Sequence, residues 1–578
     1  MGELIAPRRA ARAFVAAGVA ARVAGWAGWL LIGVGAWLAV YPSVVLLGSS
    51  VVVGGRIGLD HYLRALSDPV VHRAFGNSLL VSTAAALLGT TLGVLLAWLT
   101  TRTDLPAAGT WHAALLLPYM IPPFIGAMAW VYLLSPVGYL NRLWTWLSGS
   151  TDPLLVIYGP GGIVFALALY GYPIPYLVVR AALERLDPAL EEAARMSGAG
   201  PLRVLREVVA PIVVPAVASG ALLLWVSSLA NFGIPAVLGF PARYFVLPTR
   251  IYGTVLNFDM PDNLRVAASL SVLLAVPAGL ALLGQRRLAG ARAERFAVVT
   301  GQGGAGSRTE LGKWRGPACA VLASVVLLAT VLPLAAILVT SLTRAYGVPL
   351  GLENLTLDHY RTVLFGIPKV ARALRNSVLL AASAATLVVV LAAAVTYLSE
   401  RLHWRAGRVL EGLLAVPYAV PGTVVAVAMI LAYARPLPVV NIRLYDTAWI
   451  LLIAYLARFL AIGLRTVSSG LAQVHASLEE AARIGGAGAG RAFRDVVVPI
   501  IWPSLRSAWL LVFIPAVAEL TLSALLYSVG NETVGVVIYG LHEEGKVALS
   551  AALAFVVTAL LLTGHLLTYR TPRREWVT

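Results

Sequence analysis

Three polar side chains lie inside long apolar stretches of this sequence, where an ionisable group is costly and often serves a function. They are Glu519, Arg458 and Asn231. The carboxylate of Glu519 can bind a cation, or it can pair with the guanidinium of Arg458 across two neighbouring helices. Two roles therefore stay open for these residues. They either fix two helices together or contact a substrate that passes between the helices.

No combination of side chains in the sequence predicts catalysis. The eight histidines do not have the spacing of metal ligands, and no nucleophile lies in a pattern with a base. Cys319 is the only cysteine, which excludes an internal disulfide and a multi-cysteine metal site. The glycine-rich stretch 301–309 lacks the lysine of a phosphate-binding loop. We therefore expect no catalytic residue, no metal site and no cofactor in this chain.

A second pattern of charged residues occurs twice, once in each half of the chain. The first copy reads Leu190-Glu-Glu-Ala-Ala-Arg195, and the second reads Leu478-Glu-Glu-Ala-Ala-Arg483. In each copy a glutamate and an arginine lie one turn apart on a helix face, where they can form an ion pair. One such copy is typical of an amphipathic surface loop. Two copies in register, each before an apolar run, indicate a shared function.

The ends of these two short helices are also predicted by the sequence. Asp187 and Pro188 suit the start of the first helix, as N-cap and first-turn residue. Ser477 and Glu480 have the spacing of a capping box at the start of the second. A glycine follows each helix and tolerates the left-handed backbone of a helix stop.

The repeated pattern resembles the cytoplasmic coupling loop of ATP-binding-cassette (ABC) importer permeases. The resemblance implies that each copy docks on an ATPase subunit and transmits its movement to the membrane helices. It also implies two separate ATPase subunits, which bind the ATP, and an extracytoplasmic substrate-binding protein. The residues that match the motif are Glu191, Glu192, Ala193, Ala194 and Gly198 in the first copy, and Glu479, Glu480, Ala481, Ala482 and Gly486 in the second.

The composition places the chain in a lipid bilayer. Of its 578 residues 59% are hydrophobic and only 12% are charged, more apolar surface than a soluble domain can bury. The net charge of +17 is not evidence for a nucleic-acid partner, because the basic residues lie mostly between apolar runs. Their distribution indicates topology, with both termini in the cytoplasm, and the resemblance implies the inner membrane of a bacterium.

The apolar runs predict an all-α polytopic protein with about twelve membrane helices in two repeats of six. Matching Asn-Ser and Pro-Tyr pairs in the two halves support the repeat, and an even number of spans gives both halves the same orientation. We expect a first repeat at 1–284, a cytoplasmic linker at 285–315 and a second repeat at 316–578. The predicted spans are 26–47, 77–100, 113–135, 160–180, 211–238 and 264–284, then 316–341, 376–399, 410–434, 447–467, 499–527 and 548–569.

The fifth and eleventh spans resemble those of fused permeases for iron(III). The similar segments are Asn231-Phe-Gly-Ile-Pro-Ala-Val-Leu-Gly239 and Glu519-Leu-Thr-Leu-Ser-Ala-Leu-Leu526. This implies the type I ABC importer permease architecture and alternating access, in a transport subunit rather than an enzyme. Permeases for thiamine, aminoethylphosphonate and polyamines are relatives and remain alternative functions. A more distant alternative is an ion-coupled secondary carrier, which has no need of two docking loops.

Overall fold

The computed structural model describes residues 30–31, 33–296, 309–401, 407–436 and 441–569. In this part of the chain, ten helices are long and apolar enough to cross a membrane. Two predicted spans are not among the ten. The first begins outside the described residues, and the ninth is divided into two shorter helices. The prediction of about twelve membrane helices is confirmed.

The first half contains one short hairpin among its helices. Its elements are α2 (Tyr41–Val51), β1 (Val52–Val53), β2 (Arg56–Ile57), α3 (Asp60–Ser67), α4 (Pro69–Arg102), α5 (Ala108–Leu116), η2 (Leu117–Met120), α6 (Pro123–Leu134), α7 (Tyr139–Ser148), α8 (Pro160–Gly171), α9 (Pro173–Arg185), α10 (Pro188–Met196), α11 (Pro201–Val204), η3 (Leu205–Val209), α12 (Ala210–Leu229), α13 (Gly233–Gly239), α14 (Leu247–Val255) and α15 (Asn263–Phe296).

The second half repeats this order, without counterparts of α7 and of the hairpin β1–β2 among its described residues. Its elements are η5 (Gly312–Trp314), α16 (Arg315–Val326), η6 (Leu327–Val331), α17 (Leu332–Leu342), η7 (Leu352–Asn354), α18 (Asp358–Arg361), η8 (Thr362–Gly366), α19 (Pro368–Glu400), α20 (Gly407–Ala419), α21 (Gly422–Tyr433), α22 (Ala448–Leu471), α23 (Ala476–Ile484), α24 (Ala489–Ala492), η9 (Phe493–Val497), α25 (Val498–Val517), α26 (Ser523–Leu526), α27 (Val534–Glu543) and α28 (Val547–Tyr569).

Part of the linker predicted at 285–315 is helical in the structure. The last helix of the first half, α15, continues to Phe296, and η5 begins at Gly312. Residues 297–308, with most of the glycine-rich stretch, lie outside the described part of the chain.

Each half is held together internally by the same kind of polar contact. The side-chain amide of Asn77 in α4 donates to the carbonyl of Phe245 at 2.9 Å, and that of Asn376 in α19 donates to Gly530 at 2.9 Å. The neighbouring hydroxyls, of Ser78 and Ser377, accept from backbone amides at 2.7 and 2.8 Å. These contacts satisfy backbone groups in irregular segments within the apolar region. They explain the repeated Asn-Ser pairs in physical terms.

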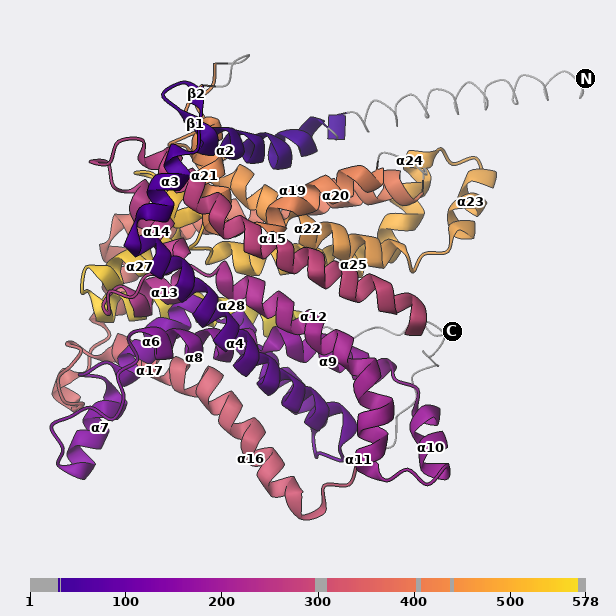
Figure 1. The fold of residues 1–578 in the computed structure, drawn as a ribbon, viewed down its shortest axis with the longest axis horizontal. Helices are drawn as coiled ribbons and strands as arrows, with labels where there is room; N and C mark the ends of the chain where they lie inside the picture. The colour runs from indigo at the N-terminus through magenta and orange to yellow at the C-terminus, as the bar shows by residue number, and fades with distance from the viewer. Residues whose placement is uncertain (1–29, 32, 297–308, 402–406, 437–440, 570–578) are drawn as a thin grey trace, which may run out of the picture.

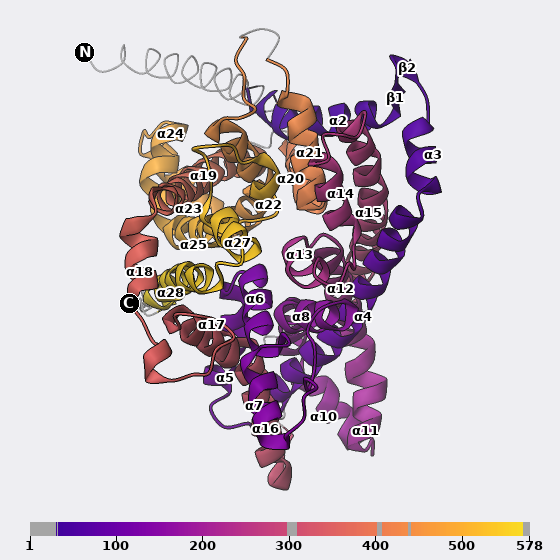
Figure 2. The ribbon, with the colours of Figure 1, turned by 90° about the vertical axis from the view of Figure 1, so that its left-hand side faces the viewer.

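Helices of the two halves interlock. In the first half α2 and α15 pack on α21 of the second half, while α17 and α28 of the second half pack around η2 and α6 of the first (Figure 2). Close approach of helices within the first half relies on small residues, which membrane helix interfaces favour. At Gly93, for example, a Cβ atom would lie 2.9 Å from the backbone nitrogen of Tyr176.

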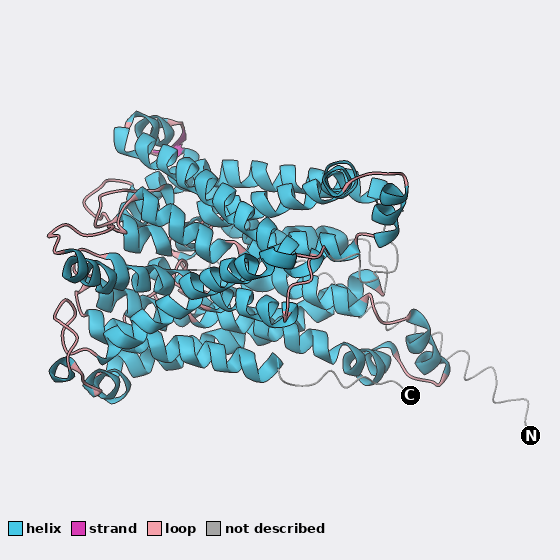
Figure 3. Cartoon of the chain, turned by 90° about the horizontal axis from the view of Figure 1, so that it is seen from below, coloured by secondary structure: helices cyan, strands magenta, loops and turns pink. Residues whose placement is uncertain are grey.

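The long helices run alongside one another, with loops and short helices at the two ends of the bundle (Figure 3). Figure 1 shows α10 with α11 and α23 with α24 at one end, on opposite sides of it. We call this the coupling end. The hairpin β1–β2 and the helix α7 lie at the other end.

Candidate functional site

Each copy of the repeated motif folds into a short helix with a defined start. The carboxylate of Asp187 accepts from the amide of Ala189 at 2.9 Å, so the predicted N-cap of α10 is confirmed. The prediction for the second copy is wrong. His475 caps α23 by accepting from the amide of Ser477 at 3.3 Å, and Ser477 lies inside the helix. The chain enters α23 two residues earlier than the capping-box spacing suggested.

The glycines after the two helices have the backbone that their position requires. Gly198 has φ +83° and Gly486 has φ +89°, which is the left-handed region. A side chain is strained in this conformation. No heavy atom lies within 4 Å of a Cβ placed at either position, so backbone conformation rather than space explains the glycine.

One glutamate of each motif turns into the protein. Glu191 is 5% exposed and forms an ion pair with Arg102 at the end of α4. Arg195, one turn further along α10, lies 3.8 Å from the same carboxylate. The motif therefore joins α10 to a membrane helix through a buried charge pair that local sequence spacing does not reveal.

The second copy uses a different partner. Glu479 is 6% exposed and accepts from the hydroxyl of Tyr397 in α19 at 2.5 Å, while Arg483 pairs with it at 2.7 Å. Arg401, which corresponds to Arg102, instead donates to the carbonyls of Leu471 and Val474, just before α23. In the first copy the arginine at the end of the membrane helix binds the buried glutamate. In the second copy the corresponding arginine binds backbone carbonyls that precede the motif.

The rest of each motif faces outward at the coupling end. Glu192, Ala193, Glu480 and Ala481 are exposed, and Ala194 and Ala482 are half-buried. Met196 and Ile484, which occupy equivalent places, are 90% and 88% exposed. Sequence reasoning missed these two apolar side chains, although their matching positions were a signal. Exposed apolar groups beside acidic ones are typical of a docking surface.

The other predicted residues meet in a central cavity of about 800 Å³. Asn231, Arg458 and Glu519 all line this cavity, with side chains from both halves around them. Glu519 and Arg458 thus face a protein cavity, as expected from the cost of a charge in lipid. The two coupling motifs lie apart from it.

Asn231 and Glu519 also have a local role that the sequence did not predict. The side-chain oxygen of Asn231 accepts from the amide of Ile234 at 3.0 Å. The carboxylate of Glu519 accepts from the amides of Leu522 and Ser523 at 2.9 and 3.1 Å. Each residue therefore caps the chain where a long helix gives way to a short one.

Arg458 lies between this cavity and a helix break. Its guanidinium donates to the carbonyl of Val420 at 2.6 Å, immediately before Pro421 and α21. This carbonyl lies at a proline break, where intrahelical hydrogen bonds are lost. Arg458 therefore stabilises the break and lines the cavity at once.

The two halves meet closely beside Asn231 and Glu519. A Cβ atom at Gly233 would lie 2.7 Å from the side chain of Phe124 and 3.6 Å from that of Leu520. The ring of Phe232 packs between Tyr252 of its own half and Tyr539 of the other, with centroids 4.9 and 6.3 Å away. These side chains join the two halves beside the central cavity, which Phe124, Gly233 and Leu520 line.

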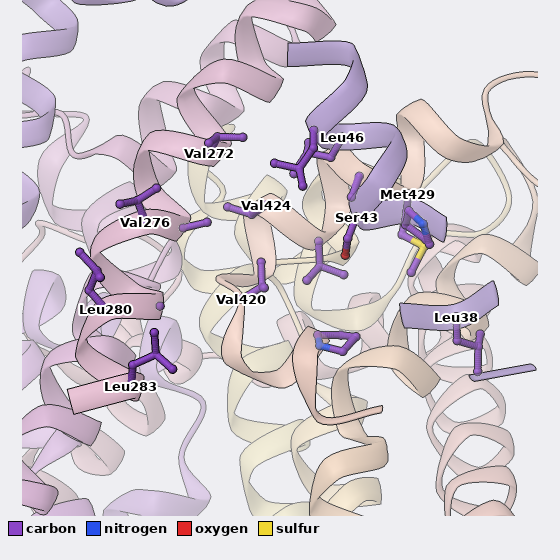
Figure 4. Close-up of a pocket in the computed structure, with 17 residues that line it drawn as sticks. Leu38, Ser43, Leu46, Val272, Val276, Leu280, Leu283, Val420, Val424 and Met429 are labelled. Carbon is purple, nitrogen blue, oxygen red and sulfur yellow. The ribbon is translucent and has the colours of Figure 1, made fainter. Parts of the chain in front are cut away.

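A second cavity, of about 420 Å³, lies between α2, α15 and α21 (Figure 4). Its walls are almost entirely apolar and include Leu46, Val276, Val424 and Met429. The polar residues predicted from the sequence lie elsewhere, so the central cavity is the candidate pathway.

The sequence matches one family twice, the inner membrane component of binding-protein-dependent transport systems, over residues 89–294 and 386–575. One match lies in each half, which agrees with the internal repeat. The ferric transport system permease protein FbpB of Actinobacillus pleuropneumoniae is 27% identical over 90% of this chain and 74% of its own.

Two shorter relatives correspond to one half. The molybdenum transport permease ModB of Escherichia coli is 30% identical over 40% of this chain and 98% of its own. The spermidine/putrescine permease PotB of the same organism is 25% identical over 44% of this chain and 94% of its own. All three are permease subunits rather than enzymes. The chain thus belongs to the family of inner membrane components of binding-protein-dependent transport systems.

Proposed function

We propose that this chain forms the whole transmembrane pathway of an ATP-driven importer, most favourably one for iron(III). The observation that carries the proposal is the pair of matched helices α10 and α23 at one end of a bundle whose halves enclose one cavity. Substrate passes from a binding protein through this cavity to the cytoplasm. The close contact near Gly233 opens and closes in alternation with the coupling end.

Two ATPase subunits dock on the coupling end, one on α10 and one on α23. The exposed residues Glu192, Met196, Glu480 and Ile484 support this, since each motif offers the same acidic and apolar surface. ATP binds to those subunits, which move the helices α4 and α19 through the buried glutamates.

The orientation follows from these partners. The coupling end lies in the cytoplasm together with both termini, and the opposite end receives the extracytoplasmic binding protein. We retain a division into a repeat at 1–284, a cytoplasmic linker at 285–315 and a repeat at 316–578.

Iron(III) is the proposed substrate because the ferric relative aligns with both halves. Thiamine, aminoethylphosphonate and polyamines are the alternatives. The similarity of one half of the chain to the spermidine/putrescine permease supports a polyamine among these. An ion-coupled carrier is a weaker reading, because it leaves the two docking surfaces without a role.

Uptake into proteoliposomes tests the proposal. The permease, reconstituted with the ATPase and the binding protein encoded beside it, should accumulate radioactive iron(III) only when ATP is present. Uptake that follows an ion gradient and ignores ATP would establish the carrier instead. ATP-dependent uptake of spermidine, thiamine or aminoethylphosphonate, but not of iron, would show that the proposed substrate is wrong and that the proposed ATP-driven mechanism is right.

A further inference from the structure

The charged side chains that line the central cavity are mostly cationic. They are Arg458 of α22, Arg506 of α25 and Glu519 at the end of α25. Two guanidinium groups therefore share a cavity of about 800 Å³ with one carboxyl group. All three belong to the second half of the chain.

The first half of the fold has neither of these two arginines. In the register of the coupling motifs, Tyr170 of the first half occupies the place of Arg458, and Ala218 occupies the place of Arg506. The first half builds the corresponding membrane spans, Pro160–Arg185 and Leu202–Leu229, without either cation. A charge that the repeat does not share, placed on a cavity wall in the membrane, indicates recognition of what enters the cavity.

The only carboxylate on the described cavity wall is already bound. Both oxygens of Glu519 accept from the amide of Leu522, at 3.0 and 2.9 Å, and one of them also accepts from the amide and the hydroxyl of Ser523. These donors compensate the negative charge, so Glu519 is poorly placed to neutralise a passing cation.

A bare iron(III) ion needs several hard oxygen ligands. In the described residues, no three His, Cys, Asp or Glu side chains gather where they can hold a metal ion. A trivalent cation would therefore meet one carboxylate that is already hydrogen-bonded, and two guanidinium groups that repel it. A ligand shell that travels with the ion removes both difficulties.

We propose that the central cavity admits anions and that iron(III) crosses it as an anionic complex with carboxylate or phosphate ligands, held through Arg458 and Arg506. The iron in this inference rests on the proposed function, while the preference for an anion rests on the cavity alone. Guanidinium groups suit this role, because they bind carboxylate and phosphate oxygens through two parallel hydrogen bonds. A cavity of this size also accommodates a small-molecule complex rather than a single ion.

Co-transport of the ligands is the direct test. Proteoliposomes with the full chain, its ATPase and its binding protein are given radioactive iron(III) with carbon-labelled citrate in one arm, and with phosphorus-labelled phosphate in the other. Iron that enters with one label in a fixed ratio supports the inference and identifies the ligand. Iron that enters without either label overturns it and leaves the iron importer intact. Uptake of labelled citrate or phosphate without iron contradicts iron(III) as the substrate in the proposed function, and it supports the preference of the cavity for anions.

Variants of the two arginines test the wall itself. Arg458→Gln together with Arg506→Gln should lower the rate of ATP-dependent uptake about tenfold or more, since each lost charge weakens the hold on the anion. Arg458→Lys with Arg506→Lys should lose less of the rate than the glutamine pair, because the charge remains although the two parallel hydrogen bonds do not. Arg443→Gln, at an exposed loop position, is the matched control. Faster uptake in the glutamine pair, with equal amounts of assembled transporter, contradicts the inference.

Discussion

Arg102, at the end of α4, forms an ion pair with Glu191 of α10, and the two side chains are only 6% and 7% exposed. Removing one partner of a buried pair leaves an uncompensated charge. We expect Arg102→Met to destabilise the protein by about 3–5 kcal/mol. Arg102→Met combined with Glu191→Leu should recover most of this loss. Thermal unfolding of the purified protein measures both, and equal loss in the single and double variants would contradict the pairing.

The corresponding change in the second half is the comparison for that prediction. Tyr397→Phe removes the hydrogen bond to Glu479 but leaves Arg483 in place, so we expect a smaller loss of about 1 kcal/mol.

The glycines after α10 and α23 should be needed for docking. Replacing Gly198 and Gly486 with valine strains a left-handed backbone by about 1–3 kcal/mol at each site, which displaces the helix ends. The ATPase should then no longer co-purify with the permease, although the chain still inserts. Gly200→Val with Gly488→Val is the control, since those glycines do not have positive φ. Normal transport and co-purification in the first pair would reject the docking role.

Glu519 should tolerate residues that can cap a helix. Glu519→Asn copies Asn231 of the first half and keeps an acceptor for the amides, so it should assemble normally. Glu519→Leu removes the acceptor and should cost about 1–2 kcal/mol. The swap of Arg458→Glu with Glu519→Arg should fail to assemble, because it places a donor against backbone donors. Recovery of assembly in the swap would show that an ion pair, rather than the cap, is the essential contact.

Thiol labelling tests the orientation. Met196→Cys and Val529→Cys, placed in a chain with Cys319 replaced by alanine, introduce single thiols at sites that are 90% and 95% exposed. The first site ends α10 at the coupling end, and the second lies just before α27, which Figure 1 shows at the opposite end. In intact cells, an impermeant reagent should label position 529 only. Labelling of position 196 before the cells are opened would reverse the topology.

A pH-dependent contact ties the loop after α4 to the start of α16. Arg315 and the amide of Leu311 donate to Asp104, and these hydrogen bonds hold the pKa of the carboxyl below its ordinary value. A lowered pKa in the folded state gives stability that is present above the unfolded pKa and is lost as pH falls through the folded one. Asp104→Asn should therefore lower the unfolding temperature equally from neutral pH down to about pH 5. Below about pH 4 the difference from the parent should shrink. A difference that grows with acid contradicts the contact, and Asp152→Asn at an exposed position is the control.

The sequence predicted the spans from their apolar runs and the repeat from matching residues in the two halves. It predicted both short helices because N-caps and helix-ending glycines act within a few residues. The pairing of Glu191 with Arg102 was not predictable, since it depends on how α10 folds back on α4. His475 as the cap of α23 was missed because the capping box offered an equally good local alternative. The caps made by Asn231 and Glu519 were missed for a related reason. An apolar run gives no sign of a break within it, and neighbouring helices decide where it breaks.

The fused chain has one consequence for how the pathway can vary. In a homodimer with twofold symmetry, every residue on the wall occurs twice, so a substitution that adds or removes one charge changes the total there by two units. Here the residue of the first half that corresponds to Arg458 is Tyr170, and the one that corresponds to Glu519 is Asn231. A single codon change therefore alters one wall only. Selectivity can shift in steps of one charge while the opposite half keeps the shape of the passage.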